Sequence, residues 1–370
     1  MKRKYYFGAL ILGSIFITSC EKESGDNTAA GKDYSTLLTD YTNNTVIATY
    51  AVMKEGSKEL YDNVVSFKNI QTQADIDAAC ESWKSTRAAW EKSEAFLFGP
   101  AAYNNLDPLL DSWPLDQSQL EQVLAGSQEL TADYVREGLG AVLRGFHTIE
   151  YLLFRNGENR KVADFTSREI DYLVAVTQVL RDDCITLWAL WNGVEPGSFE
   201  ASVLEDLEIE ISSPYKDEFA SAGLAGSRYT TQRDAVDEIV QGIMDIADEV
   251  ANGKLAGPYT TKDVLSVESW HSWNSLTDFK NNIRSIQNAY LSSYNGSSSS
   301  ASISQLVAEV DANLDADVKE KIDAALLALN NIGEPFRNNL DDDVNVPAAI
   351  SAINDVFEIF EQEVKPAILK

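Results

Sequence analysis

The chain has 370 residues, 44% of them hydrophobic, and a formal charge of −28 at neutral pH. This hydrophobic content is normal for a globular protein, and the length is enough for two separate cores. So acidic a surface repels phosphate backbones and anionic lipid headgroups and attracts cations, which excludes nucleic acid as a partner.

The first twenty residues have the pattern of a bacterial lipoprotein leader. Three basic residues at positions 2–4 precede an apolar stretch over 5–17, and a small residue stands before Cys20. The apolar stretch is too short for a permanent membrane span. We therefore expect residues 1–19 to be a cleaved signal peptide and Cys20 to be lipidated, the alternative being an ordinary buried cysteine behind an apolar start.

The mature chain is then expected to begin with a polar tether over residues 20–33. Loss of the leader removes three basic residues and no acidic one, so the formal charge becomes −31. This organisation places the protein in the cell envelope, held by lipid alone. The membrane side on which it sits, outer membrane facing the periplasm or cell surface, is left open.

Apolar residues recur three and four positions apart in nearly every long segment of the first half, as in amphipathic helices. The pattern predicts helices over residues 37–65, 76–97, 132–154 and 170–191. The second of these is expected to end at Gly99-Pro100, a helix stop signal.

Two charged residues lie where the second helix should face the core. Arg87 and Glu94 share the stripe of Trp83, Trp90 and Leu97. A buried charge costs several kcal/mol unless it is paired or bound to a metal. Seven residues apart, Arg87 and Glu94 cannot fully satisfy each other, so each needs a partner from another helix or a ligand. A structural ion pair at a solvated bundle end is the alternative.

A Pro-rich acidic loop, residues 106–116, follows this helix. Its last residue, Asp116, is a candidate to complete a cluster with Glu94 and the histidine described next. Asp116 is equally suited to capping a helix that begins near Ser118.

His147 and Glu150 stand three residues apart in the third predicted helix, so both side chains lie on one face. An imidazole and a carboxylate so placed can share a metal ion, although a hydrogen-bonded core histidine is the common alternative. Gly145, two residues earlier, would cost about 1 kcal/mol inside a helix, which indicates close helix approach or ligand access.

Cys80 and Cys184 are the two cysteines left after lipidation, and both fall on apolar helical faces. We expect two buried thiols, with a single disulfide as the alternative in an exported protein.

A segment rich in Gly, Ser, Pro and acidic residues, 194–229, separates a second set of helices. These are predicted over residues 235–251, 276–290, 303–332 with a break near Leu314, and 348–364. The fold class is therefore all-α, with two packed four-helix bundles over 34–210 and 211–370. A diverged duplication would explain this organisation.

Several motifs, taken in order along the chain, resemble the imelysin family. The likeness covers most of the mature chain, and the family's Gly-x-His-x-x-Glu signature corresponds to Gly145, His147 and Glu150. The remaining matching residues are Trp83, Arg87, Trp90 and Glu94, the segment from Asp111 through Trp113 to Asp116, and the segment from Glu268 through Ser272 to Asn282 and Ile283. The chain departs from the family pattern at Ser292-Ser293, where glycine is usual.

The resemblance implies two four-helix bundles with a functional site where they meet, in envelope lipoproteins linked to iron uptake. The family was first labelled an insulin-cleaving metallopeptidase. A zinc peptidase commonly has a second histidine ligand, and the only other histidine here is His271, for which the resemblance implies no role.

We therefore favour binding of a transition metal, iron first and zinc or copper next, in iron uptake with a transport partner in the envelope. The expected ligands are His147, Glu150, Glu94 and Asp116, with Arg87 as organiser; the expected supporting residues are Gly145, Trp113, Ser272 and Asn282. Two alternatives remain open. One is a zinc metallopeptidase, and the other is a metal-free His/Glu/Arg network in a module that binds an organic ligand or a protein.

Overall fold

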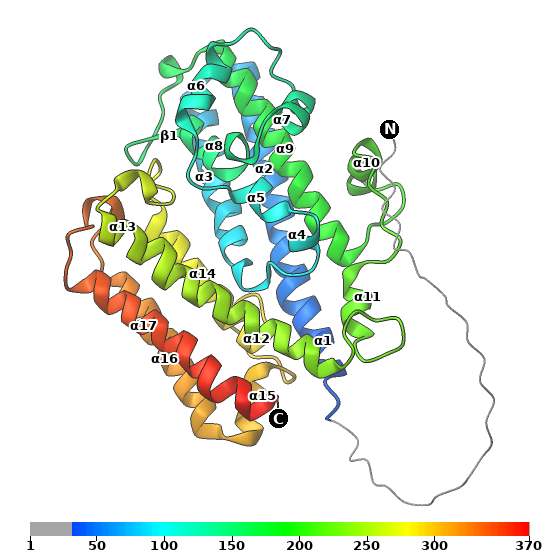
Figure 1. Cartoon of the computed structure of the whole chain (residues 1–370). Coiled ribbons are helices and arrows are strands. Elements are labelled where there is room, and N and C mark those ends of the chain that lie inside the picture. Colours follow the sequence, from blue (N-terminus) through cyan, green and yellow to red (C-terminus); the bar gives the residue numbers. More distant parts are fainter. Residues whose placement is uncertain (1–31, 370) are drawn as a thin grey trace, which may run out of the picture.

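The computed structural model describes residues 32–369, which are almost entirely helical (Figure 1). The strands in this range are β1 (Phe154–Arg155) and β2 (Glu158–Asn159), which form one short antiparallel hairpin. The expected all-α fold is confirmed. Residues 1–19, Cys20 and nearly all of the expected tether lie outside the described range. Among the described helices, none combines the length and the apolarity that crossing a bilayer requires.

The first half forms one bundle, drawn from blue to green in Figure 1. In it α2 packs against α3 and α9, and α8 packs against both α3 and α9. Its main elements are α1 (Ser35–Tyr41) and the π-helical η1 (Thr42–Ile47), which lead directly into α2 (Ala48–Ile70), then α3 (Gln73–Glu91), α8 (Gly145–Leu153) and α9 (Ser167–Asn192). The short ones are η2 (Glu94–Phe96), α4 (Pro100–Tyr103), α5 (Leu106–Asp111), α6 (Gln117–Ala125), α7 (Ala132–Gly138), η3 (Ala141–Leu143), η4 (Val162–Asp164), α10 (Phe199–Asp206) and α11 (Tyr215–Ala220).

The second half forms another bundle, from yellow-green to red in Figure 1, in which α12, α14, α16 and α17 pack together. Its elements are α12 (Gln232–Asp248), the π-helical η5 (Glu249–Leu255), α13 (Ala256–Thr261), η6 (Val264–Ser266), α14 (Ser275–Leu291), α15 (Ile303–Val310), α16 (Ala312–Asn330), η7 (Phe336–Asn338), α17 (Asn345–Ile359), η8 (Phe360–Val364) and α18 (Lys365–Ile368). The predicted break near Leu314 falls at Asp311, whose carboxylate caps α16.

Capping chemistry in the sequence explains where three long helices begin. Thr72 with Asp75, Thr166 with Glu169, and Thr231 with Asp234 each form a reciprocal capping box at the start of α3, α9 and α12. The boundary expected between residues 210 and 211 stays a prediction. The intervening α10 and α11 pack against α9 of the first bundle.

The two bundles meet where α3 and η2 of the first contact α12 and α14 of the second. Gly242 in α12 permits this close approach, because a Cβ atom there would lie 2.3 Å from the backbone oxygen of Ala95. The Ala95 N–H donates to Ser285 Oγ of α14 at 3.1 Å. The short helix η2, which follows α3, is thereby fixed against the second bundle.

Two predicted helices are shorter than their apolar pattern indicated. The helix expected to reach Gly99 ends at Glu91, because Ser93 turns back and donates from both its N–H and its hydroxyl to the Trp90 carbonyl. The helix expected over residues 132–154 is three pieces, α7, η3 and α8. Extended backbone at Leu139 and Arg144 interrupts it.

Gly145 stands at the start of α8 and not inside a helix, which corrects the expected position. Its φ of +76° is in the region that favours glycine. A Cβ atom there would lie 2.3 Å from the Leu110 carbonyl oxygen, at the end of α5. The expected close approach is therefore real, and it brings α5 against α8.

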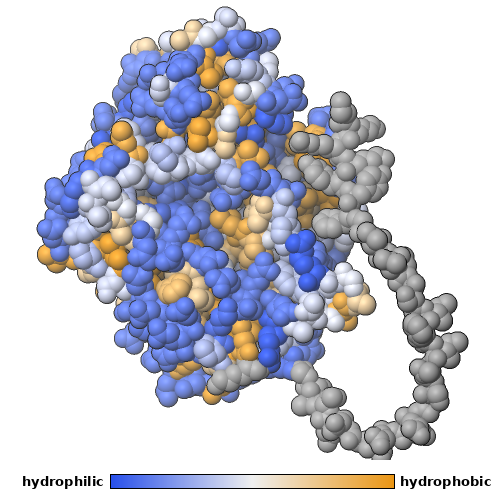
Figure 2. Space-filling view, viewed as in Figure 1, coloured by the Kyte–Doolittle hydropathy of each residue, from blue (hydrophilic) through white to orange (hydrophobic). Residues whose placement is uncertain are grey.

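Both Cys80 and Cys184 are buried and free, as expected for two core thiols. Burial raises the pKa of both thiols well above the usual range, so they stay protonated. The face in Figure 2 is mainly hydrophilic, and hydrophobic residues form small separate patches on it.

We expect Gly145→Ala to lower the free energy of unfolding by about 2–4 kcal/mol, because it adds both backbone strain and a clash with Leu110. Gly140→Ala is the matched control, since Gly140 has a φ of −74° and nothing within 4 Å of an added Cβ. Urea denaturation of both variants checks this, and equal stabilities would contradict it.

Candidate functional site

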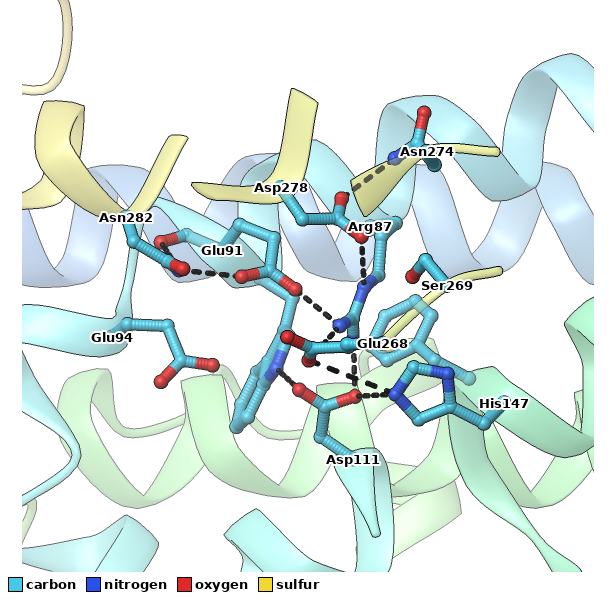
Figure 3. A network of polar contacts seen from close by, with 12 residues as sticks. Arg87, Glu91, Glu94, Asp111, His147, Glu268, Ser269, Asn274, Asp278 and Asn282 are labelled. Atoms are coloured by element: carbon cyan, nitrogen blue, oxygen red, sulfur yellow. Dashed lines mark hydrogen bonds and ion pairs between the residues drawn. The ribbon is translucent and has the colours of Figure 1, made fainter. Parts of the chain in front are cut away.

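A fully buried arginine lies at the centre of the interface between the bundles. Arg87 of α3 pairs with four carboxylates, drawn around it in Figure 3. Its guanidinium contacts Asp111 at the end of α5, Glu91 at 2.5 Å, Glu268 at 2.7 Å and Asp278 of α14 at 3.5 Å. Two partners come from each half of the chain, so this one side chain ties the bundles together.

The carboxylates around Arg87 are held in turn by neutral donors. Trp90 Nε1 donates to Asp111 Oδ2 at 2.7 Å, and Asn282 Nδ2 donates to Glu91 Oε2 at 2.5 Å. Asn274 Nδ2 donates to Asp278 Oδ1 at 2.6 Å. The expected supporting role of Asn282 is therefore to fix Glu91.

His147, at the start of α8, faces this cluster through one ring nitrogen. Its Nε2 lies 3.0 Å from Asp111 Oδ1 and 3.8 Å from Glu268 Oε1 (Figure 3). The Trp113 ring packs against the imidazole, with centroids 4.6 Å apart. A buried imidazole nitrogen with two carboxylates in front of it has the donor set of a mixed nitrogen and oxygen metal site.

Glu150 lies on the other side of the same ring. Its Oε2 is 3.2 Å from His147 Nδ1, and its Oε1 accepts from both the N–H and the hydroxyl of Ser272, at 2.8 Å each. Spacing on α8 does bring His147 and Glu150 together, as expected. Because Glu150 contacts Nδ1, it orients the ring for a ligand at Nε2 and is not itself beside that ligand.

Glu94 is buried beside the site. It lines a pocket of about 400 Å³ together with Trp113, Lys254, Glu268 and further residues, namely Leu97, Asp107, Pro108, Asp111, Ser112, Glu249, Gly253 and Ser266. Five of these lining residues are acidic and one is basic. The pocket therefore favours cations, and it leads to Asp111 and Glu268 beside His147.

Burial shifts the pKa values of several acidic residues in this region. Burial raises the pKa of Glu91 and Glu94 well above the usual range and raises the pKa of Asp278 and Asp107 to about 6 each. Arg87 faces four carboxylates, and Lys254 and His147 face some of them too, so acidic side chains outnumber basic ones in this region.

The surroundings of His147 and Glu268, by contrast, favour the charged form of each side chain. Burial and Arg87 disfavour a charged imidazole, but Asp111, Glu150 and Glu268 together raise the pKa of His147 well above its usual range. Burial likewise opposes ionisation of Glu268, but Lys254, His147 and Arg87 lower its pKa. The surrounding carboxylates therefore favour the protonated, cationic form of the His147 imidazole.

Asp116 does not join the cluster. It caps α6, accepting from the Gln119 N–H at 2.9 Å and from its side-chain amide at 2.6 Å. Helix capping was the alternative role that the sequence allowed for Asp116. Asp111, at the end of α5, lies at the cluster and Asp116 does not. Within residues 32–369, two groups of side chains could hold a metal, namely Asp111 with His147 and Glu268, and Glu91 with Glu94 and Asp111.

Sequence reasoning missed Glu91, Asp111, Glu268, Asp278 and Lys254 as site residues. Glu91 follows Arg87 by four residues, which on a helix is ion-pair spacing and could have indicated the contact. Asp111 and Glu268 each begin a motif that carries the family resemblance. Nothing local in the sequence marks Lys254.

The residues at His147 fit a metal ion. Its Nε2 is buried and makes no hydrogen bond of acceptable geometry, although Asp111 is 3.0 Å away. Glu268 Oε2 is also buried without a hydrogen bond, its nearest cation being Lys254 at 3.2 Å. One imidazole and two carboxylates suit iron, zinc or manganese, whereas the thiols at Cys80 and Cys184 belong to neither ligand group.

Comparisons with known proteins identify the family and the fold. The sequence model of the family described as Imelysin matches residues 46–362. Iron-regulated protein A of Synechococcus elongatus is 28% identical over 326 residues, covering 87% of this chain and 83% of the relative.

Two crystal structures are similar to the chain. One, described as an iron-regulated protein A precursor from Parabacteroides distasonis, has a TM-score of 0.81 and 31% identity and covers 92% of this chain and 97% of the other. The other, an imelysin-like protein from Psychrobacter arcticum, has a TM-score of 0.68 at 12% identity over 90% of this chain and 95% of its own, a likeness of fold alone.

We expect Arg87→Met to lower the free energy of unfolding by about 3–5 kcal/mol at pH 8, because four carboxylates lose their central cation. Arg87 lowers the pKa values of all four carboxylates, so without the guanidinium these values rise and the folded variant binds more protons than the unfolded chain. Its stability therefore falls as pH rises, and the deficit should be smaller at pH 5.

Urea denaturation at the two pH values measures both effects. Arg228→Met is the control, because Arg228 is 38% exposed and pairs with Glu218 at 3.4 Å, so it should cost less than about 1 kcal/mol. An Arg87→Met deficit that is the same at both pH values would rule out the charge explanation.

Proposed function

Because the chain belongs to the imelysin family, we propose that it binds a transition-metal ion, iron in the first place, between its two bundles as part of iron uptake. The observation that carries this is the buried His147 Nε2, which faces Asp111 and Glu268 without a hydrogen bond. The ligands in this proposal are His147, Asp111 and Glu268.

Two further features support a cation as the ligand. The pocket that leads to the ligands is lined by five acidic residues and one basic residue. Around Arg87 the acidic side chains also outnumber the basic ones when Lys254 and His147 are counted, and a multivalent ion would add positive charge there. Carboxylate oxygens with one imidazole suit iron better than they suit copper(I), which prefers thiolates and thioethers.

The choice of iron and of uptake as the process draws on the relatives. Two of them carry the name iron-regulated protein A. In this proposal the leader over residues 1–19 directs export and is cleaved, and the lipidated Cys20 holds the protein at the envelope, where it passes iron to a transport partner. A bound metal would here be cargo, and the chain's own residues bind it, orient it and shield it from water.

We expect His147→Gln to abolish metal binding, because it removes the only imidazole facing the cluster. Calorimetric titration of the purified protein with Fe²⁺ under anaerobic conditions, and with Zn²⁺, measures the loss. Asp116→Asn is the control and should bind as the wild type does, because Asp116 caps α6 outside both ligand groups.

Identical titration curves for wild type and His147→Gln would rule out a metal site at His147. If His147→Gln lowered only the thermal stability, the metal-free network would be the better interpretation. Zinc-dependent cleavage of an unfolded protein by the wild type would favour the peptidase alternative.

We expect Glu150→Gln to weaken metal binding by about 10–100-fold and to leave the stoichiometry at one, because Glu150 orients the imidazole through Nδ1. The same titrations measure this. Complete loss of binding, as in His147→Gln, would show that Glu150 is itself a ligand and would contradict its placement behind the ring.

A further inference from the structure

A lysine ammonium occupies the space through which a cation would reach His147. Lys254 lies in the π-helical segment η5, and its side chain is only 10% exposed. Its Nζ lies 3.2 Å from Glu268 Oε2, and 3.9 Å from one oxygen each of Glu91 and Glu94. The ammonium thus already interacts with both groups of carboxylates that could hold a metal.

The Lys254 ammonium also has a carboxylate partner that is exposed to solvent. Glu249, one turn earlier in η5, has a carboxylate 3.6 Å from Nζ, and its side chain is 55% exposed. Both residues line the pocket. Lys254 therefore stands between inner carboxylates that are buried and an outer one that is in solvent, and rotation of a flexible four-carbon side chain exchanges them.

We propose that Lys254 is a tethered competitor that sets which cations enter, so that only a multivalent ion displaces it from Glu268. This inference rests on the proposed function and names a specificity residue of the same site. A tethered ammonium competes at a high effective concentration and lowers the apparent affinity of every ion by the fraction of time it occupies the site.

Charge decides which ions overcome this competition. A monovalent ion that replaces the ammonium gains no charge against the inner carboxylates. A divalent or trivalent ion places one or two more positive charges against the inner carboxylates than the ammonium does. The displaced Lys254 then retains Glu249 as its partner at the mouth. Sodium and potassium are thereby excluded, although both are far more abundant than iron.

The test compares Lys254→Met, Lys254→Arg and wild type in calorimetric titrations with Zn²⁺ and with Fe²⁺ under anaerobic conditions. Lys365→Met is the matched control, because Lys365 pairs with Asp237 at 2.7 Å, away from the pocket. We expect Lys254→Met to bind at least tenfold more tightly than wild type and to become sensitive to added KCl. Lys254→Arg keeps the charge and should bind no more tightly than wild type.

A second measurement does not depend on a variant that folds. Acetylation of the wild-type protein with acetic anhydride, followed by mass spectrometry, should label Lys254 several-fold more with saturating Zn²⁺ than without it. Lys365 should be labelled equally in both conditions. A lysine with a purely structural role would show no such change.

The outcomes separate this inference from the proposed function. If wild type binds metal but Lys254→Met binds equally or more weakly, and Lys254 labelling does not change, the competitor role is wrong and the metal site stands. Binding by Lys254→Met alone would support a competitor that fully blocks the site. If neither protein binds metal, both proposals fail.

Discussion

The structure depends on one buried cation, the guanidinium of Arg87. It is fully buried, and its four carboxylate partners come from α3, α5, the segment before α14 and α14 itself. A charge so placed is tolerated only with its partners, and the partners are tolerated only with the charge. The two bundles therefore cannot separate without exposing these charges or leaving them unpaired. The same ion pairs hold the bundles together and form the candidate site.

The network and a metal site are compatible interpretations of the same residues. Arg87 uses its nitrogen atoms to hold Asp111 and Glu268, and these two carboxylates also face His147 Nε2. A structural network would be expected to satisfy every buried polar atom. Here His147 Nε2 has an ion-pair contact with Asp111 at 3.0 Å but no hydrogen bond of acceptable geometry. Asp111 and Glu268 also line a pocket, which distinguishes this region from a closed ion-pair cluster.

The sequence was sufficient for the fold class and for the residues on long periodic helices, because burial of an apolar stripe determines both. It placed Arg87 and His147 in the site on that basis. It failed where short-range turn chemistry interrupts a continuous pattern, as at Ser93 and Gly145. It also chose Asp116 over Asp111, five residues earlier in one loop, because only the path of the chain between α5 and α6 decides which carboxylate faces Arg87. Glu268 and Lys254 come from the other half of the chain, and no local pattern pairs them with His147.

One short segment of the second bundle explains why both halves are needed. Glu268 faces Nε2 of His147, and Ser272, four residues later, holds Glu150 against Nδ1. The segment that precedes α14 therefore acts on both ring nitrogens of His147. It supplies a carboxylate that faces Nε2, and it holds the carboxylate that contacts Nδ1. A displacement of this segment would change the ring's orientation and its carboxylate partner at the same time. The first bundle supplies the Gly-x-His-x-x-Glu motif and Asp111 but lacks Glu268 and Ser272, so the surroundings of His147 are complete only when the second bundle is packed against it.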